Sequence, residues 1–520
     1  MKKGKQSNIE FMPVLMAAYV IITLSGMLLV FHDFYYDILE TKRTFYTTCT
    51  TVMLVLTGVY MFLMADPMKA IKENKGKKLL DIISLADFFV IMWGVVIILS
   101  TLLSPDKRAA FLGNRGRYTG CRLLLLYVAA YFCVTRYYRP KEWHMAIFLG
   151  AGMLMCLFGI TDFFDMDLLG FKEEIKEIQR YMFSSTIGNI NTYTSCVAMV
   201  MAFAGVMFAA ADNIKKAAVY GVCSFISFFA LIVGESDNAY LSLAAFFGLL
   251  PLYLFRTRRG IKRYFALVAG FFTAAKAVSV LQVSMADQVI PINGLFQVIG
   301  SYRNLTAVVV FLWCATAICY GADHFISKNN PSSAVSPWIV RVWIMVLVLV
   351  VLAGVYMFYD VNVAGNGEKY GSMRQYLWFD DDWGTHRGYI WRIAVEDYQK
   401  FPLIQKIFGY GPDTFGIVTK ANNYPEMFDR YYETFDSAHN EYLQYLVTIG
   451  PFGLLAYLGI HGSIIYQVIK ERLDQPLCVA ALFAVLCYAF QAAVNINQPI
   501  AAPVMWTLLA VSVSKVVKRL

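Results

Sequence analysis

The chain has 520 residues, of which 58% are hydrophobic and only 16% are charged, whereas a soluble globular domain is about one quarter charged. This balance excludes an ordinary soluble protein and indicates an integral membrane protein. The net charge of +9 does not indicate nucleic-acid binding, because most of the basic residues fall in short loops and tails between hydrophobic runs.

Hydrophobic runs recur along the whole chain, and each is long enough to cross a hydrocarbon core of about 30 Å. The first run follows the basic start MKKGKQ without a small-residue cleavage site, so we expect a retained helix rather than a signal peptide. We predict an all-α, polytopic membrane protein with about fourteen transmembrane helices in a single integral membrane domain, residues 1–520. The predicted spans are 11–30, 44–64, 82–103, 119–137, 143–164, 192–210, 217–233, 239–255, 264–283, 305–320, 337–358, 451–469, 476–493 and 499–514.

The distribution of lysine and arginine orients these spans. With the N-terminus in the cytoplasm, more than half of the 45 basic residues fall in predicted cytoplasmic segments, including clusters at 69–78 and 256–263. The positive-inside rule then puts both termini in the cytoplasm and the long polar loop, residues 359–438, outside it. We therefore expect a multi-pass protein of the cytoplasmic (inner) membrane, with one long extracytoplasmic loop that contains short helices.

The ten cysteines lie in or beside the apolar spans, and the sequence has no CxxC pair and no spacing typical of metal ligands. We therefore expect no disulfide, no metal site and no cofactor. No predicted cytoplasmic loop is large enough to bind a nucleotide. Any chemistry would need a substrate that is already activated in the membrane.

Three predicted extracytoplasmic segments precede the long loop. Within residues 104–120, Arg115 and Arg117 lie among glycines, either as interfacial arginines of a turn or as contacts for a lipid phosphate. Within residues 168–182, apolar side chains recur at helical spacing, which predicts an amphipathic helix on the membrane surface with a structural role. In SSTIGNINTY, Asn189 begins a helix, and it either caps that helix or helps its N-terminus to hold a phosphate.

Two other polar features lie in or between the spans. Lys276 falls in the middle of a predicted span, where its charge is costly in lipid, so it should face the protein interior or a cavity. Glu235 and Asp237, in the segment GESDN, are interpreted as solvated residues of a short turn.

The long loop is much longer than a passive connector needs to be, which favours a functional role. From Arg387 onward the loop has helical periodicity, and at about 100° per residue Arg387 shares a face with Ile390 and Ala394. Arg392 lies nearly opposite and has Glu396 four residues on, the spacing of a surface ion pair. A cation on an apolar stripe should snorkel or meet an anion, and a planar guanidinium suits a pyrophosphate head group.

The loop ends in DSAHNEYLQYL, which contains a candidate base. Ser437 is a good N-cap for a helix that opens at the next residue, so we expect His439 in the first helical turn. The positive helix end disfavours imidazolium, and a neutral imidazole can accept a proton; alternatively, His439 is a polar surface residue. Gly450 and Pro451 then break the helix, which predicts a short helix at 438–449 before a separate membrane crossing.

These segments resemble the O-antigen ligase and polymerase superfamily. Its ordered pattern is an Arg helix with Trp, a Pro-Leu and Gly-x-Gly turn, and His-Asn-x-x-Leu-Gln before a Gly-rich span. The pattern is matched by HRGYIWRIAVEDYQKFPLIQKIFGYGPDTF and DSAHNEYLQYLVTIGPFGLLAYL, with GNRGRYTG and SSTIGNINTY upstream. The resemblance covers about residues 104–510, with 184–460 as its core region.

The resemblance implies a GT-C-like, metal-independent glycosyltransferase that inverts the transferred sugar at the outer face of the membrane. Its partners would be an undecaprenyl-pyrophosphate-linked glycan donor, membrane lipids and an acceptor hydroxyl on lipid A core, a polysaccharide or a protein, but no nucleic acid. His439 matches the family's catalytic histidine, and Arg387 matches the arginine tied to the donor pyrophosphate. Relatives often carry Ser-Arg-Gly where this chain has GESDN, so the donor is held differently or by a substitute among Arg115, Arg117 and Arg180, with Asn189 nearby.

Two other classes of protein remain as alternatives. A lipid-linked saccharide flippase or other transporter would need a continuous polar path through the helices, which only Lys276 suggests, and the sequence shows no internal repeat. A sensory or scaffolding membrane protein would leave Arg387 on its apolar face unexplained.

Overall fold

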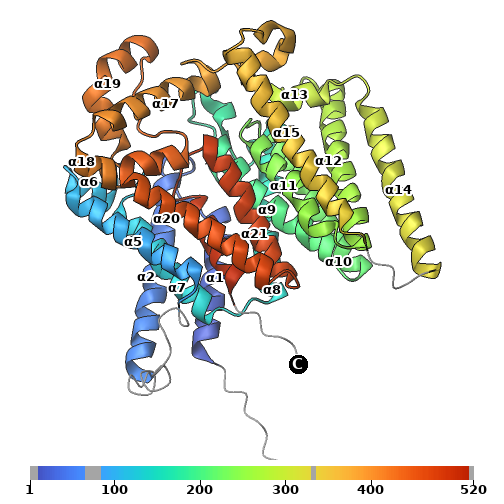
Figure 1. The fold of residues 1–520 in the computed structure, drawn as a ribbon, viewed down its shortest axis with the longest axis horizontal. Helices are drawn as coiled ribbons and strands as arrows, with labels where there is room; N and C mark the ends of the chain where they lie inside the picture. The colour runs from blue at the N-terminus through green and yellow to red at the C-terminus, as the bar shows by residue number, and fades with distance from the viewer. Residues whose placement is uncertain (1–9, 65–82, 330–334, 515–520) are drawn as a thin grey trace, which may run out of the picture.

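The computed structural model describes residues 10–64, 83–329 and 335–514, so the start MKKGKQ and the basic cluster at 69–78 lie outside the described residues. The described chain is almost entirely helical (Figure 1). Its helices are α1 Phe11–Leu29, α2 Ile38–Met64, α5 Leu85–Leu103, α6 Lys107–Leu112, α7 Cys121–Tyr137, α8 Glu142–Phe163, η1 Glu177–Met182, α9 Ile190–Ala210, α10 Ile214–Val233, α11 Ala239–Leu254, α12 Arg258–Ser284, α13 Gly294–Gly300, α14 Leu305–Asn329, α15 Trp338–Asn362, η2 Gly367–Met373, α16 Arg374–Leu377, α17 Trp383–Lys400, α18 Leu403–Phe408, α19 Phe415–Tyr431, α20 Glu441–Glu471, α21 Pro476–Gln491, η3 Ala492–Val494 and α22 Ala502–Val513. One antiparallel pair of two-residue strands, β1 Phe183–Ser184 and β2 Gly188–Asn189, is the only sheet among the described residues.

The prediction of an all-α, polytopic membrane protein is confirmed. Each of the fourteen predicted spans contains a helix, but eleven helices of the described chain are long and apolar enough to cross a membrane. The other three, α7, α11 and α22, have only 17, 16 and 12 residues. The helix α22 is short because residues 495–501 before it are not α-helical and carry Asn495 and Asn497 to the loop end of the bundle.

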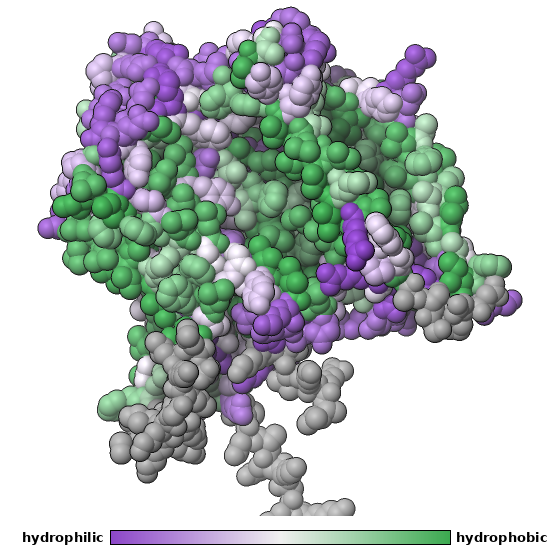
Figure 2. Space-filling model, in the orientation of Figure 1, coloured by the Kyte–Doolittle hydropathy of each residue, from purple (hydrophilic) through white to green (hydrophobic). Residues whose placement is uncertain are grey.

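The surface divides into an apolar belt and two polar ends. Figure 2 shows hydrophobic residues around the middle of the molecule and hydrophilic residues above and below. The segment between α15 and α20, which contains α17, α18 and α19, covers one polar end, here called the loop end (Figure 1). Such a belt is the pattern expected for a chain surrounded by lipid.

The helix α9 is the centre of the bundle. Beyond its polar first turns it is apolar, and nearly all of its residues are buried, which is typical of a helix enclosed by others. It packs against α10 and α21, while α20 packs along α5. Because α9 begins just after Asn189, this arrangement fixes the GNIN segment at the loop end of the bundle.

The long loop has a small hydrophobic core of its own. The spacing of α17 predicted its buried face correctly, since Arg387, Ile390 and Ala394 are buried. Arg392 on the opposite face forms ion pairs with Glu396 at 3.2 Å and Asp381 at 3.0 Å. The core consists of Tyr389, Ile390, Ile393, Ala394, Phe401, Phe415, Val418, Met427, Phe435, Ala438 and Val447. The loop is therefore a folded cap and not a flexible connector.

The predicted break at Gly450 and Pro451 is present. Gly450 has a φ of 71° and a ψ of 176°, so α20 is kinked there. In a regular helix the carbonyls of Val447 and Thr448 would accept the N–H groups of residues 451 and 452. Pro451 has no N–H and the kink displaces the N–H of residue 452, so both carbonyls lose their usual partners. The N–H groups of the Gly-x-Gly turn of the loop, at Tyr410 and Gly411, donate to these two carbonyls at 3.0 and 2.9 Å.

The predicted amphipathic helix over 168–182 is wrong. This segment forms turns followed by the short η1, and Gly170 has a φ of 73°. The side chain of Phe171 packs among aromatic rings, and buried Lys172 forms an ion pair with Asp162 at 2.9 Å. These tertiary contacts pull the segment into the bundle, whereas a surface helix would have left Lys172 in water.

Candidate active site

Arg387 is the first regularly helical residue of α17. The three residues before it, Gly384, Thr385 and His386, have φ values of 62°, 58° and 67°. The left-handed conformation costs about 1–2 kcal/mol for a residue with a Cβ, so the run at Thr385 and His386 is strained. Strain of this kind persists where the surrounding structure holds the backbone in place. Here the strained turn directly precedes Arg387 and sets the direction in which its side chain enters the protein.

Oxygen atoms without a formal charge hold the buried Arg387 guanidinium. Its Nε donates to the Val494 carbonyl at 3.1 Å, and its Nη2 donates to Asn238 Oδ1 at 3.5 Å. Its Nη1 donates to the Gly384 carbonyl and, at 3.2 Å, to Thr385 Oγ1. Burial lowers the pKa of Arg387, although the charge of Asp237 opposes this effect.

No carboxylate of the described residues forms an ion pair with Arg387, which is only 9% exposed. A buried cation without a partner of opposite charge is costly. Four of its five N–H groups donate to the acceptors above, so one N–H of Nη2 stays available within the described structure. The environment of Arg387 is therefore suited to an incoming anion.

The GESDN turn lies beside Arg387. Asp237 is exposed, as expected for a turn residue, whereas Glu235 is half-buried and the two carboxylates accept hydrogen bonds from residues around the start of α13. Glu235 Oε1 accepts hydrogen bonds from the backbone and side chain of Asn293 at 3.1 and 2.6 Å. Asp237 Oδ1 accepts a hydrogen bond from the N–H of Leu295 at 3.4 Å. Burial raises the pKa of both carboxyl groups. These bonds fix the turn that presents Asn238 to Arg387.

Asn191 connects the GESDN turn to the GNIN segment. Its Oδ1 accepts hydrogen bonds from Ser236 Oγ at 2.6 Å and from Asn238 Nδ2 at 3.1 Å. Asn189 caps α9 instead, because its Oδ1 accepts the N–H of Asn191 at 3.0 Å. The asparagine that joins the Arg387 network is thus Asn191, which the sequence analysis did not single out.

His439 lies just outside α20, so its predicted place in a first helical turn is wrong. The helix begins at Glu441 and its N-cap is Asn440, whose Oδ1 accepts the N–H groups of Tyr442 and Leu443, both at 3.0 Å. His439 precedes this cap with a φ of 47°. Asparagine is as good an N-cap as serine, and here it takes the role expected of Ser437.

The imidazole of His439 is neutral for reasons other than a helix end. Burial, followed by the charges of Arg387 and Arg117, lowers its pKa to about 3, while Asp436 acts in the opposite direction. Arg387 and His439 are far apart in the sequence of the loop. Because the charge of Arg387 lowers the pKa of His439, the two side chains lie within electrostatic reach of each other. Arg117 completes the group from a third segment.

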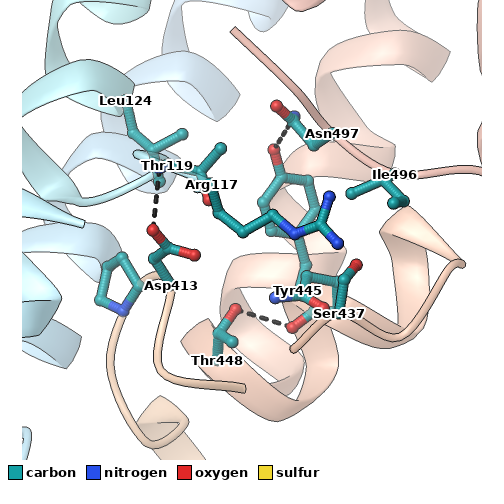
Figure 3. A pocket seen from close by; sticks show the side chains of 11 residues that line it. Arg117, Thr119, Leu124, Asp413, Ser437, Tyr445, Thr448, Ile496 and Asn497 are labelled. Carbon is teal, nitrogen blue, oxygen red and sulfur yellow. Dashed lines mark hydrogen bonds between the residues drawn. The ribbon is translucent and has the colours of Figure 1, made fainter. Parts of the chain in front are cut away.

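A small pocket lies beside Arg117 and includes Ser437, two residues before His439 (Figure 3). Arg117 extends across it and donates from Nε and Nη2 to Asp436 Oδ1, at 3.0 and 2.6 Å. The cavity has a volume of about 20 Å³, enough for about one water molecule. Its lining comes from the first loop, α7, the residues after the Gly-x-Gly turn, the start of α20 with the segment before it, and the segment before α22: Arg117, Thr119, Leu124, Pro412, Asp413, Ser437, Gln444, Tyr445, Thr448, Ile496 and Asn497.

Asp413 fastens the loop that carries Arg117. Its Oδ2 accepts the backbone N–H groups of Asn114 and Thr119 at 2.7 and 3.0 Å, and Figure 3 shows the second of these bonds. Burial raises the pKa of Asp413 to about 7. The carboxyl group therefore changes charge near neutral pH at a point that joins two segments of the site.

Replacing Asp413 by asparagine should flatten the dependence of stability on pH. Because the pKa of Asp413 is raised by folding, its stabilising effect is full below its ordinary value of 3.8 and is lost as the pH rises through about 7. Between pH 5 and pH 8 the parent should lose roughly 2–3 kcal/mol relative to Asp413→Asn, which cannot ionise, and most of this loss falls between pH 5 and pH 7. Thermal unfolding of both purified proteins in detergent tests this, and parallel pH curves would contradict it.

Buried Glu441 anchors the start of α20. Its carboxylate accepts hydrogen bonds from Tyr457 Oη at 2.7 Å, Tyr488 Oη at 2.9 Å and Asn497 Nδ2 at 2.8 Å. Such a network fixes the helix end to which Asn440 and His439 are attached. The sequence indicated this residue only as part of the HNEYL segment.

The remaining predicted site residues do not join the group. Arg115 is exposed on the loop that carries Arg117, and it makes no side-chain hydrogen bond to another part of the described chain. Arg180 is exposed on η1 and donates to the Ile175 carbonyl at 3.3 Å. Of the three arginines considered as substitutes for the missing Ser-Arg-Gly, only Arg117 lies beside His439 and the pocket.

Comparison with known families assigns one part of the chain. Residues 298–458 match a family model described as O-antigen ligase. The matched segment contains Arg387, Asp413 and His439, whereas Arg117 and Asn238 lie outside it. No curated protein matches the chain.

Proposed function

We propose that the chain, whose residues 298–458 match the O-antigen ligase family model, transfers a glycan from undecaprenyl pyrophosphate to an acceptor hydroxyl group. The match supports ligase- or polymerase-type glycosyl transfer, with a lipid-linked glycan as donor and a glycan as acceptor. One observation carries the finer proposal: a buried arginine without a carboxylate partner in the described residues lies within electrostatic reach of a neutral histidine.

Arg387 is the proposed contact for the donor pyrophosphate. The acceptors of its hydrogen bonds hold the guanidinium in place but leave its charge uncompensated. A charge-assisted bond from the remaining N–H to a phosphate oxygen would supply the missing charge partner. The interaction strengthens as negative charge develops on the leaving pyrophosphate, and such stabilisation is often the largest electrostatic contribution to catalysis.

His439 is the proposed general base. It accepts the proton of the acceptor hydroxyl while that oxygen bonds to the anomeric carbon. The bond between the anomeric carbon and the pyrophosphate oxygen breaks, and its electron pair leaves with undecaprenyl pyrophosphate. A single displacement of this kind inverts the anomeric configuration and needs no metal ion.

Donor binding would also make His439 a better base. With a pKa of about 3, His439 is always neutral near pH 7 but accepts a proton weakly, because a general base works best near the operating pH. The negative charges of a bound pyrophosphate offset those of Arg387 and Arg117, and nearby negative charge raises the pKa of an imidazole. The base thus becomes effective when the donor is in place.

This coupling predicts a change in the pH profile when Arg117 is replaced by glutamine. Arg117 lowers the pKa of His439, so the loss of Arg117 raises that pKa. As the pH is lowered, the activity of Arg117→Gln should therefore begin to fall at a higher pH than the activity of the parent. The acid limbs of kcat/KM for the parent and Arg117→Gln provide the measurement. Any titration of the donor itself affects both proteins equally, so a difference between their acid limbs reports on the enzyme. An unchanged acid limb would contradict the proposed effect of Arg117 on the pKa of His439.

The proposed site lies at the outer face of the cytoplasmic membrane. The positive-inside distribution supports this orientation, with the loop end outside and the basic residues 256–263 in the cytoplasm. Two experiments test the orientation: cleavage by an externally added protease, and labelling by a thiol-reactive probe of a cysteine introduced in place of Asp429. Asp429 is an exposed residue of α19. Labelling in intact cells is expected, and labelling only after the membrane is opened would reverse the proposal.

A reconstituted transfer reaction tests the function itself. The purified protein receives an undecaprenyl-pyrophosphate-linked glycan and, in separate reactions, acceptors that carry lipid, polysaccharide or protein hydroxyl groups. We expect a glycosylated acceptor of inverted configuration, equimolar undecaprenyl pyrophosphate and no loss of rate with a metal chelator. Movement of the donor between leaflets without any joined product would instead indicate a flippase.

A further inference from the structure

A second cavity lies in the apolar belt, between α10, α12 and α14. Its volume is about 670 Å³, within the range of pockets that bind small molecules, roughly 300–1,000 Å³. Most of its lining is apolar, and it comprises Phe208, Ile214, Ala217, Ala218, Gly221, Val222, Ser224, Phe225, Phe228, Arg263, Ala266, Leu267, Gly270, Trp313, Thr316, Ala317 and Tyr320. In Figure 1, α14 stands at the edge of the bundle, and its main packing partner is α12.

The cavity lies toward the end of the bundle opposite the candidate active site. Along α10 its lining runs from Ile214, the first residue of the helix, to Phe228, which is about 21 Å at the helical rise of 1.5 Å per residue. The GESDN turn follows the other end of α10. The lining therefore covers most of α10 and is somewhat deeper than one leaflet, since half of a hydrocarbon core is about 15 Å.

Arg263 is the only charged residue in the lining of this cavity. Its guanidinium stacks on the ring of Phe208 at 4.6 Å, and its Nε is buried without a hydrogen-bond partner in the described structure. Neighbouring cations are neutralised: Lys262 by Asp323, and Arg259 by Asp212 at 2.7 Å. An apolar cavity with one uncompensated cation beside it suits an amphiphile with a negative head group.

We infer that this cavity binds an anionic phospholipid, with one acyl chain between α10, α12 and α14 and its phosphate on Arg263. Charge complementarity favours this occupant, because the phosphate of a zwitterionic lipid is already balanced by its own ammonium group, whereas an anionic lipid brings a net negative charge to Arg263. Basic pockets between membrane helices recognise such anionic head groups. The site is distinct from the proposed donor site, which lies at the other end of α10. In the proposed orientation it takes a lipid from the cytoplasmic leaflet.

Quenching of Trp313 tests the inference, because this side chain lines the cavity. Phosphatidylglycerol with brominated acyl chains is titrated into the full-length protein in non-brominated detergent, and the Trp313 signal is the difference from Trp313→Phe. Half-maximal quenching of the parent should need at least about tenfold more brominated phosphatidylcholine than brominated phosphatidylglycerol. Arg263→Gln should likewise need at least about tenfold more brominated phosphatidylglycerol than the parent, which is the loss expected for one charge-assisted bond. Arg263→Lys should retain part of the preference.

Two further variants distinguish the cavity from the general membrane surface. Arg259→Gln removes a neighbouring cation that is paired with Asp212, so it should bind phosphatidylglycerol like the parent. Gly270→Leu fills the cavity, since a Cβ at Gly270 meets nothing closer than Phe228 at 4.0 Å, and it should prevent quenching by either lipid. Equal quenching by the two lipids, equal loss in both arginine variants, or displacement of the brominated lipid by lower concentrations of undecaprenyl phosphate would overturn the inference.

Discussion

Replacing His439 by alanine is expected to reduce glycan transfer by at least about a hundredfold, the usual lower range for loss of a positioned general base. The side chain is partly buried and donates no hydrogen bond that holds another described segment in place, so the variant should fold and insert normally. Transfer is measured as the initial rate of acceptor glycosylation with purified protein at saturating donor. A rate near that of the parent would remove His439 from the mechanism.

Two companion variants separate chemistry from structure. His439→Asn keeps a polar side chain and tolerates the left-handed φ of 47° at this position, but it cannot accept a proton near pH 7, so it should be as inactive as alanine. His32→Ala provides the matched control, because His32 is 79% exposed and pairs only with Asp37 in the described structure. This control should retain the activity of the parent.

Replacing Arg387 by alanine should lower kcat by about a hundred- to a thousandfold, as expected when one donor to developing charge is removed. Arg387→Lys should recover little of this loss, because a lysine ammonium cannot reach Val494, Gly384 and Asn238 together with the planar geometry of a guanidinium. Affinity for the donor should fall in both variants. Donor titrations that separate kcat from KM provide the measurement.

Arg392 is the matched control for Arg387, since it lies on the opposite face of the same helix. It pairs with Asp381, Glu396 and Glu426 on the surface of the folded loop. Arg392→Gln should therefore lower the thermal stability of the protein slightly while kcat stays near that of the parent. If Arg392→Gln and Arg387→Ala lost activity equally, the role of Arg387 would be one of folding and not of pyrophosphate binding.

Local sequence patterns predicted the features that depend on near neighbours. Helical periodicity separated buried Arg387 from partly exposed Arg392, and the Gly-Pro pair predicted the break at Gly450. Apolar run length predicted a helix in each span, but three of these helices are shorter than the runs suggested, because run length does not reveal where a buried helix such as α22 begins. Each of these features is set by propensity or spacing within a few residues.

The contacts that build the site could not be predicted in this way. Asn238 meets Arg387 across 149 residues of sequence, and Asp413 meets Asn114 across 299. Neither partner carries a local signal, so GESDN was interpreted as a departure from the family pattern although it supplies a contact to Arg387. The same limitation applies to His439, whose position depends on whether Ser437 or Asn440 caps the next helix, two residues with nearly equal preference.

Two hydrogen-bond partners of Arg387 come from segments that would not be exchanged if the matched segment were swapped between relatives. The segment 298–458 supplies the arginine and the histidine, but Asn238, Val494 and Arg117 come from sequence on both sides of it. A chimera that receives this segment alone would inherit the reactive groups without the framework that positions them. In the proposed mechanism, exchange of this segment alone would therefore not transfer donor specificity, and changes in the folded loop would require matching changes in the first loop, the GESDN turn and the segment before α22.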